Sequence, residues 1–251
     1  ASQHFFSRHV CESRKNVKIR FMSSTHRFRG SLNLCRLVLL CLACVWGGSF
    51  ALEVSTDRLQ SLAASRYGAK GAKSVGSWLQ LLRNPPPALE RDKLTLANDF
   101  WNRALLSGED QTIWGQADYW ATPLESLGKG AGDCEDYVIG KYFTLLSMGV
   151  PANKLRFIYV RARVGGPASS SQVAHMVLGY YETPNAVPLV LDSLISTILP
   201  ATQRRDLTPV FSFNADGVYV DGKPAAPVDR LSRWRDLLPV SYTHLTLPTK
   251  A

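Results

Sequence analysis

Apolar positions at helical spacing predict that the first part of the folded chain is helical. Leucine and other apolar residues recur every three to four positions over residues 57–66, 74–83 and 88–106. The run Asn84-Pro85-Pro86-Pro87 separates the second segment from the third, because proline does not continue a helix. We therefore predict helices over these three segments.

The middle of the chain predicts a loop followed by a strongly apolar helix. Residues 109–125 combine aromatic and polar side chains, which is typical of an ordered loop. The glycine-rich segment 128–133 predicts a short, flexible lead-in. Over residues 134–148 apolar side chains cover most of one helical side, and Gly149 stands where glycine ends many helices.

After Gly149 the apolar pattern changes from helical to extended. Five segments show this change, and we predict them to be strands: 155–164, 173–182, 187–191, 210–213 and 218–220. A short helix over 229–238 is predicted to close the domain. Helices followed by a block of strands predict an α+β fold, with N-terminal helices and then an antiparallel β-sheet.

The composition is that of an ordinary globular protein. Of 251 residues, 45% are hydrophobic and 20% charged, which excludes a disordered, collagenous or coiled-coil protein. No apolar run in the sequence approaches the roughly 20 residues of a membrane-spanning helix, which excludes a polytopic membrane protein. We predict one domain over residues 52–239 and interpret the dissimilar segment 240–251 (VSYTHLTLPTKA) as a non-native tail.

The formal net charge of +9 is concentrated in the first 51 residues. Eight of the 29 basic residues and one of the 20 acidic residues lie there, which leaves 21 basic and 19 acidic groups for the rest of the chain. A nucleic-acid-binding protein carries its positive charge on the folded domain, as a patch that faces phosphates. The distribution therefore argues against nucleic acid as a partner.

The same N-terminal region has the pattern of a secretory signal peptide. Basic residues precede the apolar run 37–46, and small residues follow it up to Ala51. We predict that residues 1–51 are a leader that exports the protein to the periplasm; an uncleaved inner-membrane anchor is the alternative. Met22 is a second candidate start, and in that case residues 1–21 are not native.

Outside the leader and the tail the chain keeps one cysteine and one histidine, Cys134 and His175. The other four of the five cysteines lie in residues 1–51, as do three of the five histidines, and one histidine lies in the tail. A single cysteine cannot form an internal disulfide in an exported domain. Cys134 is therefore either a buried, inert side chain or a free thiol kept for chemistry.

Cys134, His175 and Asp192 form a candidate catalytic triad. Cys134 begins a predicted helix, where the helix dipole and unpaired N–H groups lower the pKa of a thiol and bind an oxyanion. His175 lies in a predicted strand and Asp192 ends the next one, so the carboxylate can reach the ring and orient it. Taken singly, each residue also fits a role in packing or in a turn; together they favour nucleophilic catalysis.

Three acidic residues surround the cysteine at the predicted helix start: Asp133, Glu135 and Asp136. Acidic side chains favour the first turn of a helix because they compensate its dipole, which is one explanation. Beside a thiolate, however, three anions raise the thiol pKa and oppose the nucleophile. A bound Ca²⁺ would cancel this repulsion and prefers such oxygens, although the spacing is not that of an EF-hand loop. The residues alone leave both explanations open.

Four segments carry a family resemblance: 118–125 (DYWATPLE), 132–137 (GDCEDY), 174–178 (AHMVL) and 191–193 (LDS). Together they resemble the bacterial transglutaminase-like cysteine proteinases, over about residues 75–239. The resemblance implies a papain-like, transglutaminase-like core with Cys134 as nucleophile, His175 as base and Asp192 as the acid that orients the ring. It also implies calcium bound by Asp133, Glu135 and Asp136.

The resemblance further implies a biological role. Proteinases of this family cleave large cell-surface adhesins near the N-terminus, at a site that contains two alanines, and so control biofilm attachment. An inner-membrane receptor that senses cyclic di-GMP (LapD-like) holds them inactive. We therefore expect a large adhesin as substrate and such an inhibitory receptor as partner.

Three other functions remain open on the sequence. A transglutaminase would use the same triad and transfer the acyl group to an amine. A cell-wall peptidase of the NlpC type also places Asp-Cys at a helix start, but usually follows it with Ser-Gly, whereas Glu135-Asp136 stand here. A non-catalytic periplasmic binding module would keep the fold and bury Cys134 away from solvent.

Overall fold

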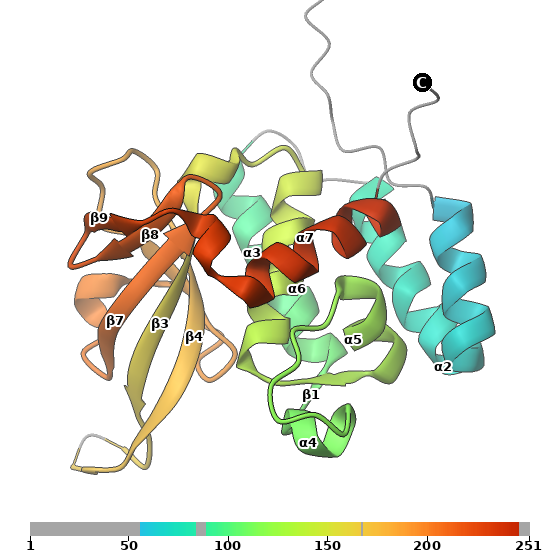
Figure 1. Ribbon diagram of the computed structural model, residues 1–251, viewed down its shortest axis with the longest axis horizontal. Coiled ribbons are helices and arrows are strands. Elements are labelled where there is room, and N and C mark those ends of the chain that lie inside the picture. The colour runs from blue at the N-terminus through green and yellow to red at the C-terminus, as the bar shows by residue number, and fades with distance from the viewer. Residues whose placement is uncertain (1–55, 84–88, 167, 246–251) are drawn as a thin grey trace, which may run out of the picture. The chain divides into compact units, whose positions relative to one another are not determined.

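A computed structural model describes residues 56–83, 89–166 and 168–245 (Figure 1). These residues form the predicted α+β fold, with helices first and an antiparallel sheet afterwards. The predicted leader 1–51 and the end of the predicted tail lie outside the described residues. Among the described helices, none combines the length and the apolar character that crossing a membrane requires.

The first helix, α2 (Thr56–Arg83), contains both N-terminal helices that the sequence predicts. It bends at Gly68, whose backbone has φ 66° and ψ −165°, a conformation that glycine adopts without a steric penalty. The C-terminal half approaches α5 (Pro123–Lys129) closely, because Gly71 leaves room for the Gly128 carbonyl. Two glycines therefore set the bend and the packing of α2.

Two central helices, α3 (Glu90–Ala104) and α6 (Cys134–Ser147), form the helical core. They confirm the predicted helices over 88–106 and 134–148. Trp101 of α3 packs on Gly140 of α6, where a Cβ would come within 2.4 Å of the indole ring. The hydroxyl of Thr144 accepts hydrogen bonds from the indole N–H groups of Trp78 and Trp101, each at 2.8 Å. One threonine thus joins three helices.

The sheet has seven antiparallel strands in the order β6-β5-β4-β3-β7-β8-β9 (Figure 1). The strands are β3 (Leu155–Arg163), β4 (Gln172–Tyr180), β5 (Leu189–Leu191), β6 (Leu199–Pro200), β7 (Leu207–Asn214), β8 (Gly217–Val220) and β9 (Lys223–Ala226). The five predicted strands are confirmed. The sequence does not predict β6 and β9, the two edge strands, because each is short and contains a proline, a residue that argues against a strand.

Both faces of the sheet are covered by apolar side chains. Phe157, on the face toward the helices, belongs to the main core, whereas its neighbour Ile158 belongs to a smaller cluster with Val160, Val177 and Val190. This division follows from the alternation of side chains along a strand. Helix α6 packs on β4, which brings the start of that helix to the sheet.

The segment before α6 is more ordered than the sequence predicts. Residues 109–125 include the short helix α4 (Asp110–Ile113), and α5 begins at Pro123 behind a capping box formed by Thr122 and Glu125. Residues 128–133 are not a flexible lead-in: α5 ends at Lys129 with Gly130 as its C-cap, and β2 (Ala131–Gly132) pairs in parallel with β1 (Leu106–Ser107). Helix caps and a two-residue strand are too short to show a periodic pattern of apolar residues, so the sequence predicts a loop there.

The last helix extends beyond its predicted end. Three short 3₁₀ turns, at Ala152–Lys154, Ala201–Gln203 and Val228–Arg230, precede it. The sequence predicts a helix over 229–238, whereas α7 runs from Ser232 to Leu245 with Pro239 inside it. Its buried residues Trp234 and Leu237 anchor the helix on the core. The helix thus enters the segment that we interpret as a non-native tail, and that interpretation stays a prediction.

The contact between Trp101 and Gly140 gives a test of the helical core. We expect Gly140→Ala to lower the free energy of unfolding by about 2 kcal/mol, because the methyl group overlaps the indole ring. Gly76→Ala, in α2, is the matched control, since its Cβ meets only the flexible end of Gln60 at 3.2 Å. Urea denaturation measures both variants. Equal stability of Gly140→Ala and the wild type would contradict the packing.

Candidate active site

Cys134 is the first residue of α6, as the sequence predicts. Asp133 caps the helix, and its side chain accepts a hydrogen bond from the Asp136 backbone N–H. Gly132, the last residue of β2, lies so close to Asp136 that a Cβ there would be 2.7 Å from the Asp136 Cβ. The turn that presents the thiol is therefore fixed by a strand before it and a capped helix after it.

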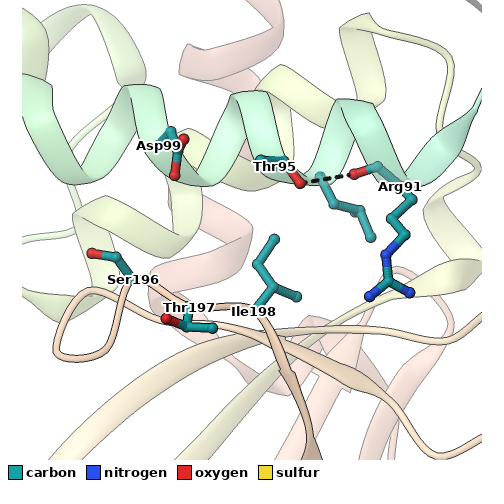
Figure 2. Close-up of a pocket in the computed structure, with 7 residues that line it drawn as sticks. Arg91, Thr95, Asp99, Ser196, Thr197 and Ile198 are labelled. Atoms are coloured by element: carbon teal, nitrogen blue, oxygen red, sulfur yellow. Dashed lines mark hydrogen bonds between the residues drawn. The ribbon is translucent and has the colours of Figure 1, made fainter.

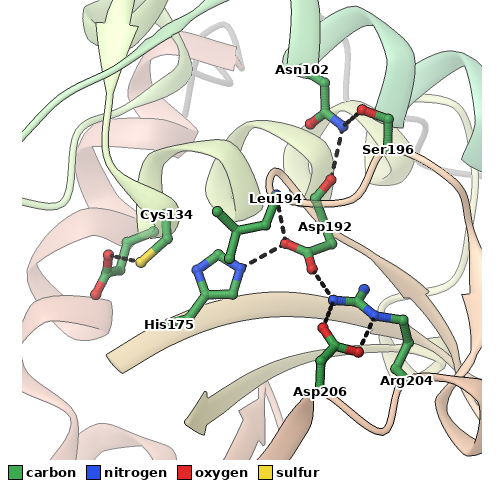
Figure 3. Close-up of polar contacts among 9 residues, drawn as sticks. Asn102, Cys134, His175, Asp192, Leu194, Ser196, Arg204 and Asp206 are labelled. Atoms are coloured by element: carbon green, nitrogen blue, oxygen red, sulfur yellow. Dashed lines mark hydrogen bonds and ion pairs between the residues drawn. The ribbon is translucent and has the colours of Figure 1, made fainter. Parts of the chain in front are cut away.

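His175 and Asp192 form a buried pair beside this helix start. His175 lies in β4, and Asp192 directly follows β5, the neighbouring strand. His175 Nε2 lies 2.6 Å from Asp192 Oδ1, and the exposed fractions of the two residues are 4% and 0%. In Figure 3 the imidazole stands between Asp192 and Cys134, with its other ring nitrogen on the Cys134 side. An ionised Asp192 accepts a hydrogen bond from Nε2–H, and in this tautomer Nδ1 carries no proton and can act as a base.

Further groups hold Asp192, and the most important is Arg204, which sequence reasoning missed. Arg204 Nη2 lies 2.6 Å from Asp192 Oδ2, and the same guanidinium binds Asp206 at 2.7 and 3.0 Å. The Leu194 backbone N–H donates to Asp192 Oδ1 at 3.0 Å, and the Asn102 amide donates to the Asp192 main-chain oxygen at 2.8 Å (Figure 3). No pattern in the sequence marks Arg204, because arginine is normally an exposed residue.

These contacts keep Asp192 ionised. Burial by itself raises the pKa of Asp192, but the hydrogen bonds from His175, the Leu194 N–H and Arg204 outweigh it and lower the pKa to about 2. A charged, fixed carboxylate stabilises an imidazolium that forms beside it. The pair therefore has the arrangement that a histidine general base requires.

The thiol of Cys134 hydrogen-bonds to its neighbour rather than to the histidine. Cys134 Sγ donates to Glu135 Oε2 at 2.8 Å. Burial, followed by the charges of Glu135 and Asp133, raises the pKa of the Cys134 thiol well above its ordinary range. This differs from the expectation that the helix N-terminus lowers this pKa, because burial and the adjacent carboxylates raise it.

Three carboxylates form a cluster next to the thiol. Asp110, Asp133 and Asp136 each place an oxygen within 4.8 Å of the others. Asp110, in α4, was missed by sequence reasoning: it lies far from the cysteine along the chain, and the β1–β2 pairing brings its loop to the site. Glu135, which the family resemblance implies as a calcium ligand, is not one of these three; its carboxylate accepts a hydrogen bond from the thiol and also lies against Asp133, and its role as a ligand stays a prediction.

The chemistry of this cluster fits a hard divalent cation. Asp110 Oδ1 and Asp136 Oδ2 are buried and have no hydrogen-bond partner. Burial and then the neighbouring acids raise the pKa of Asp133 to about 9, and burial is also the main cause that raises the pKa of Asp136 to about 8. Unpaired, buried carboxylate oxygens are the ligands that Ca²⁺ prefers, and a cation would remove their mutual repulsion.

A cavity of about 410 Å³ lies on the other side of the segment that follows Asp192. Figure 2 shows it between α3, which contributes Arg91, Thr95 and Asp99, and the segment 196–198. Asn98 of α3 donates to the Ser196 carbonyl at 2.7 Å and so ties this segment to the helix. The cavity lining includes neither His175 nor Asp192, and we assign it no role in catalysis.

The pairing of Asp192 predicts a pH-dependent stability. Because its folded pKa lies below the ordinary value, ionised Asp192 stabilises the fold above about pH 4, and this contribution is lost as the pH falls towards about 2. We expect Asp192→Asn to lower the free energy of unfolding by about 3 kcal/mol at neutral pH, since it leaves Arg204 without its buried partner. The difference from wild type should narrow as the pH falls below about 4.

The control for this measurement is Asp99→Asn, which removes an exposed carboxylate paired with Arg103 at 3.8 Å. Denaturant titrations at several pH values measure all three proteins. A deficit of Asp192→Asn that does not change with pH, or that equals the deficit of Asp99→Asn, would refute the stabilising role of the buried pair.

The chain is similar to known proteins in sequence and in structure. Residues 87–204 match the family model described as "Bacterial transglutaminase-like cysteine proteinase BTLCP". The chain is similar to the structure of Legionella pneumophila LapG, with 36% identity over 75% of this chain and 98% of that chain, and a TM-score of 0.64.

The chain is also similar to two further structures of the Legionella protein, one treated with EGTA and one bound to calcium. EGTA-treated Legionella pneumophila LapG shares 36% identity over 75% of this chain and 98% of that chain, with a TM-score of 0.65. The calcium-bound form shares 37% identity over 74% and 99%, with a TM-score of 0.63. A comparison with curated proteins found no match. The extent and identity of these similarities show that the chain belongs to the bacterial transglutaminase-like cysteine proteinases.

Proposed function

We propose that this protein is a calcium-dependent periplasmic cysteine endopeptidase that cleaves the N-terminal region of a large cell-surface adhesin and so controls biofilm attachment. The observation that carries the proposal is the buried His175–Asp192 pair, 2.6 Å apart, beside the free thiol at the start of α6. Membership of a cysteine proteinase family supports the same chemistry.

In the proposed reaction Cys134 is the nucleophile and His175 the general base. His175 Nδ1 takes the thiol proton, while Asp192 holds Nε2 and stabilises the imidazolium. The thiolate attacks the scissile carbonyl, and the Cys134 backbone N–H at the helix start donates to the oxyanion. His175 then protonates the leaving amine, and water releases the acyl group from the sulfur.

The thiol has to leave Glu135 before it can react. Its hydrogen bond to Glu135 Oε2 holds the proton on the sulfur and away from His175. Asp110, Asp133 and Asp136 would hold Ca²⁺, which supplies positive charge next to the thiol and lowers the free energy of the thiolate. The calcium-bound Legionella structure supports this part of the proposal.

A groove beside the catalytic pair suits an extended peptide. Its volume is about 500 Å³, and its lining includes Tyr159, Val173, Val210 and Phe211. Val173 and Val210 are exposed by 44% and 43%, and Tyr159 stacks on Phe211 at 5.2 Å between ring centroids. Strand β4 continues from this groove directly to His175. We propose that the adhesin segment binds here through apolar side chains.

The cellular part of the proposal rests on the sequence. The signal-peptide pattern in residues 1–51 supports export to the periplasm. The resemblance to the family supports a large adhesin as substrate and a LapD-like, cyclic di-GMP-sensing receptor of the inner membrane as inhibitory partner. Substrate and receptor are both proteins, which agrees with an open groove rather than a closed small-molecule pocket.

Removal of the nucleophile tests the proposed reaction. We expect Cys134→Ala to abolish cleavage of an adhesin N-terminal fragment while the thermal unfolding curve stays that of a folded protein. Ser147→Ala, at the opposite end of α6, is the matched control and should keep full activity. Cleavage is measured by electrophoresis, and a labelled amine in the same reaction detects acyl transfer. Cleavage by Cys134→Ala, or incorporation of the amine in place of hydrolysis, would reject the proposal.

Carboxylate substitutions test the calcium site. Saturating Ca²⁺ at about 100 times its dissociation constant should stabilise the wild type by about 2.7 kcal/mol, and EGTA should abolish cleavage. Asp110→Asn and Asp136→Asn should lose most of this calcium-dependent shift of the unfolding temperature. Asp118→Asn, an exposed acid paired with Arg233 at 3.1 Å, should keep it. Cleavage that persists in EGTA would remove calcium from the mechanism, and a full shift in Asp110→Asn would remove Asp110 from the site.

A further inference from the structure

Part of the edge of strand β4 has no neighbouring strand. Strand β5 pairs with β4 only from Leu178 to Tyr180, and it ends opposite Leu178. Strand β3 covers the other edge of β4 along its whole length. Residues 172–176, the free edge of β4, therefore have a strand on one side only among the described residues. A free strand edge presents N–H and C=O groups that can pair with another extended chain.

Backbone hydrogen bonds determine which main-chain groups face the free edge. At one end of the β3–β4 pair, the Val164 N–H donates to the Ser171 carbonyl at 3.0 Å. At the other end, the Tyr181 N–H donates to the Lys154 carbonyl at 2.8 Å. Main-chain groups alternate in direction along a strand, so all odd-numbered residues of β4 pair with β3. The N–H and C=O groups of the even-numbered residues point away from β3.

The free edge leads to the proposed nucleophile. The Met176 main chain lies against the Cys134 sulfur, so the thiol is placed along β4 just beyond the end of β5. The outward N–H and C=O groups of Ala174 and Gln172 follow, and they have no hydrogen-bond partner among the described residues. Both residues are exposed and line the groove of about 500 Å³. A chain that lies along this edge therefore passes from the groove to the sulfur.

We propose that the substrate binds by adding an extended strand to the free edge of β4. The proposal rests on the proposed function, since the thiol has to meet a peptide bond. Substrate main-chain groups on one side of the scissile bond pair with Ala174 and Gln172, while the scissile carbonyl lies at the Cys134 sulfur. Alternate side chains of the added strand then face the groove. The edge thus selects an extended main chain, and the groove selects its side chains.

The charges beside the free edge favour a substrate segment over a second copy of this chain. Arg161 and Arg163 of β3 lie directly opposite Ala174 and Gln172. Residues that are directly opposite in an antiparallel pair place their side chains on the same face. Charged side chains are a common means by which a strand edge avoids pairing with its own copy. They attract an extended segment that carries acidic side chains.

The test uses a peptide α-ketoamide with alanines on both sides of the ketone, with calcium present throughout. The Cys134 sulfur adds to the ketone carbon: a C–S bond forms, the S–H bond and the carbonyl π bond break, and the proton moves to the ketone oxygen. Thiol titration and intact-mass spectrometry detect this adduct, so no adhesin is needed. Hydrogen exchange of the backbone amides, followed by NMR, then reports on β4.

In the free protein, the amides of Gln172 and Ala174 should exchange at least about tenfold faster than the odd-numbered amides of β4, which pair with β3. The adduct should slow both and leave the odd-numbered amides unchanged. The matched control is the amide of Leu178, which points outward but is covered by β5. It should be protected in both states.

A series of ketoamides, each with one N-methylated alanine, gives a second measurement. N-methylation removes a single N–H donor. Along the half of the ligand that pairs with β4, it should weaken binding about tenfold at every second alanine, because only these donate to the strand. Methylation at the alanines between them should leave the affinity almost unchanged, and these ligands are the matched controls.

The outcomes separate this proposal from the proposed function. Protection of Gln172 and Ala174 in the free protein would overturn the proposal, because a second copy would then cover the edge. An adduct that leaves both amides unprotected, or N-methylation effects that do not alternate, would also overturn it and leave the triad intact. A protein that forms no adduct loses Cys134 as its nucleophile and, with it, both proposals.

Discussion

The buried carboxylate of Asp192 is the constraint on which the rest of the active site depends. Its exposed fraction is 0%, and a carboxylate in that position is stable only when both oxygens are paired. His175 and the Leu194 N–H satisfy one oxygen, and Arg204 satisfies the other. The His175 ring is thus oriented by a carboxylate that is itself held by the Leu194 backbone and by Arg204.

The start of helix α6 combines a thiol with carboxylates. Its first residue is Cys134, and its first turn holds Glu135 and Asp136. Burial and the adjacent carboxylates raise the pKa of the thiol, which donates a hydrogen bond to Glu135. The fold therefore places the proposed nucleophile where its reactivity depends on what neutralises its neighbours.

The sequence predicts the fold class, the main helices and the central strands, because these have long apolar patterns. It also places Cys134 at a helix start and predicts the contact between His175 and Asp192, since adjacent strands bring them together. It does not predict Arg204 or Asp110, because their contacts with Asp192 and with Asp133 and Asp136 arise from the folding of loops that carry no sequence pattern. Helix caps and proline-containing edge strands are not predicted for a different reason: their local sequence pattern is the same as that of a loop.

The unpaired polar atoms beside the proposed nucleophile are acceptors, Asp110 Oδ1 and Asp136 Oδ2. Burial and the adjacent carboxylates disfavour negative charge on the Cys134 sulfur, so they oppose transfer of its proton to an imidazole. Asp192, which Arg204 and the Leu194 N–H hold in place, favours positive charge on that imidazole. Under the proposed function, a divalent cation among the carboxylates would therefore remove the opposition on the sulfur side, while Asp192 supports the same proton transfer from the imidazole side.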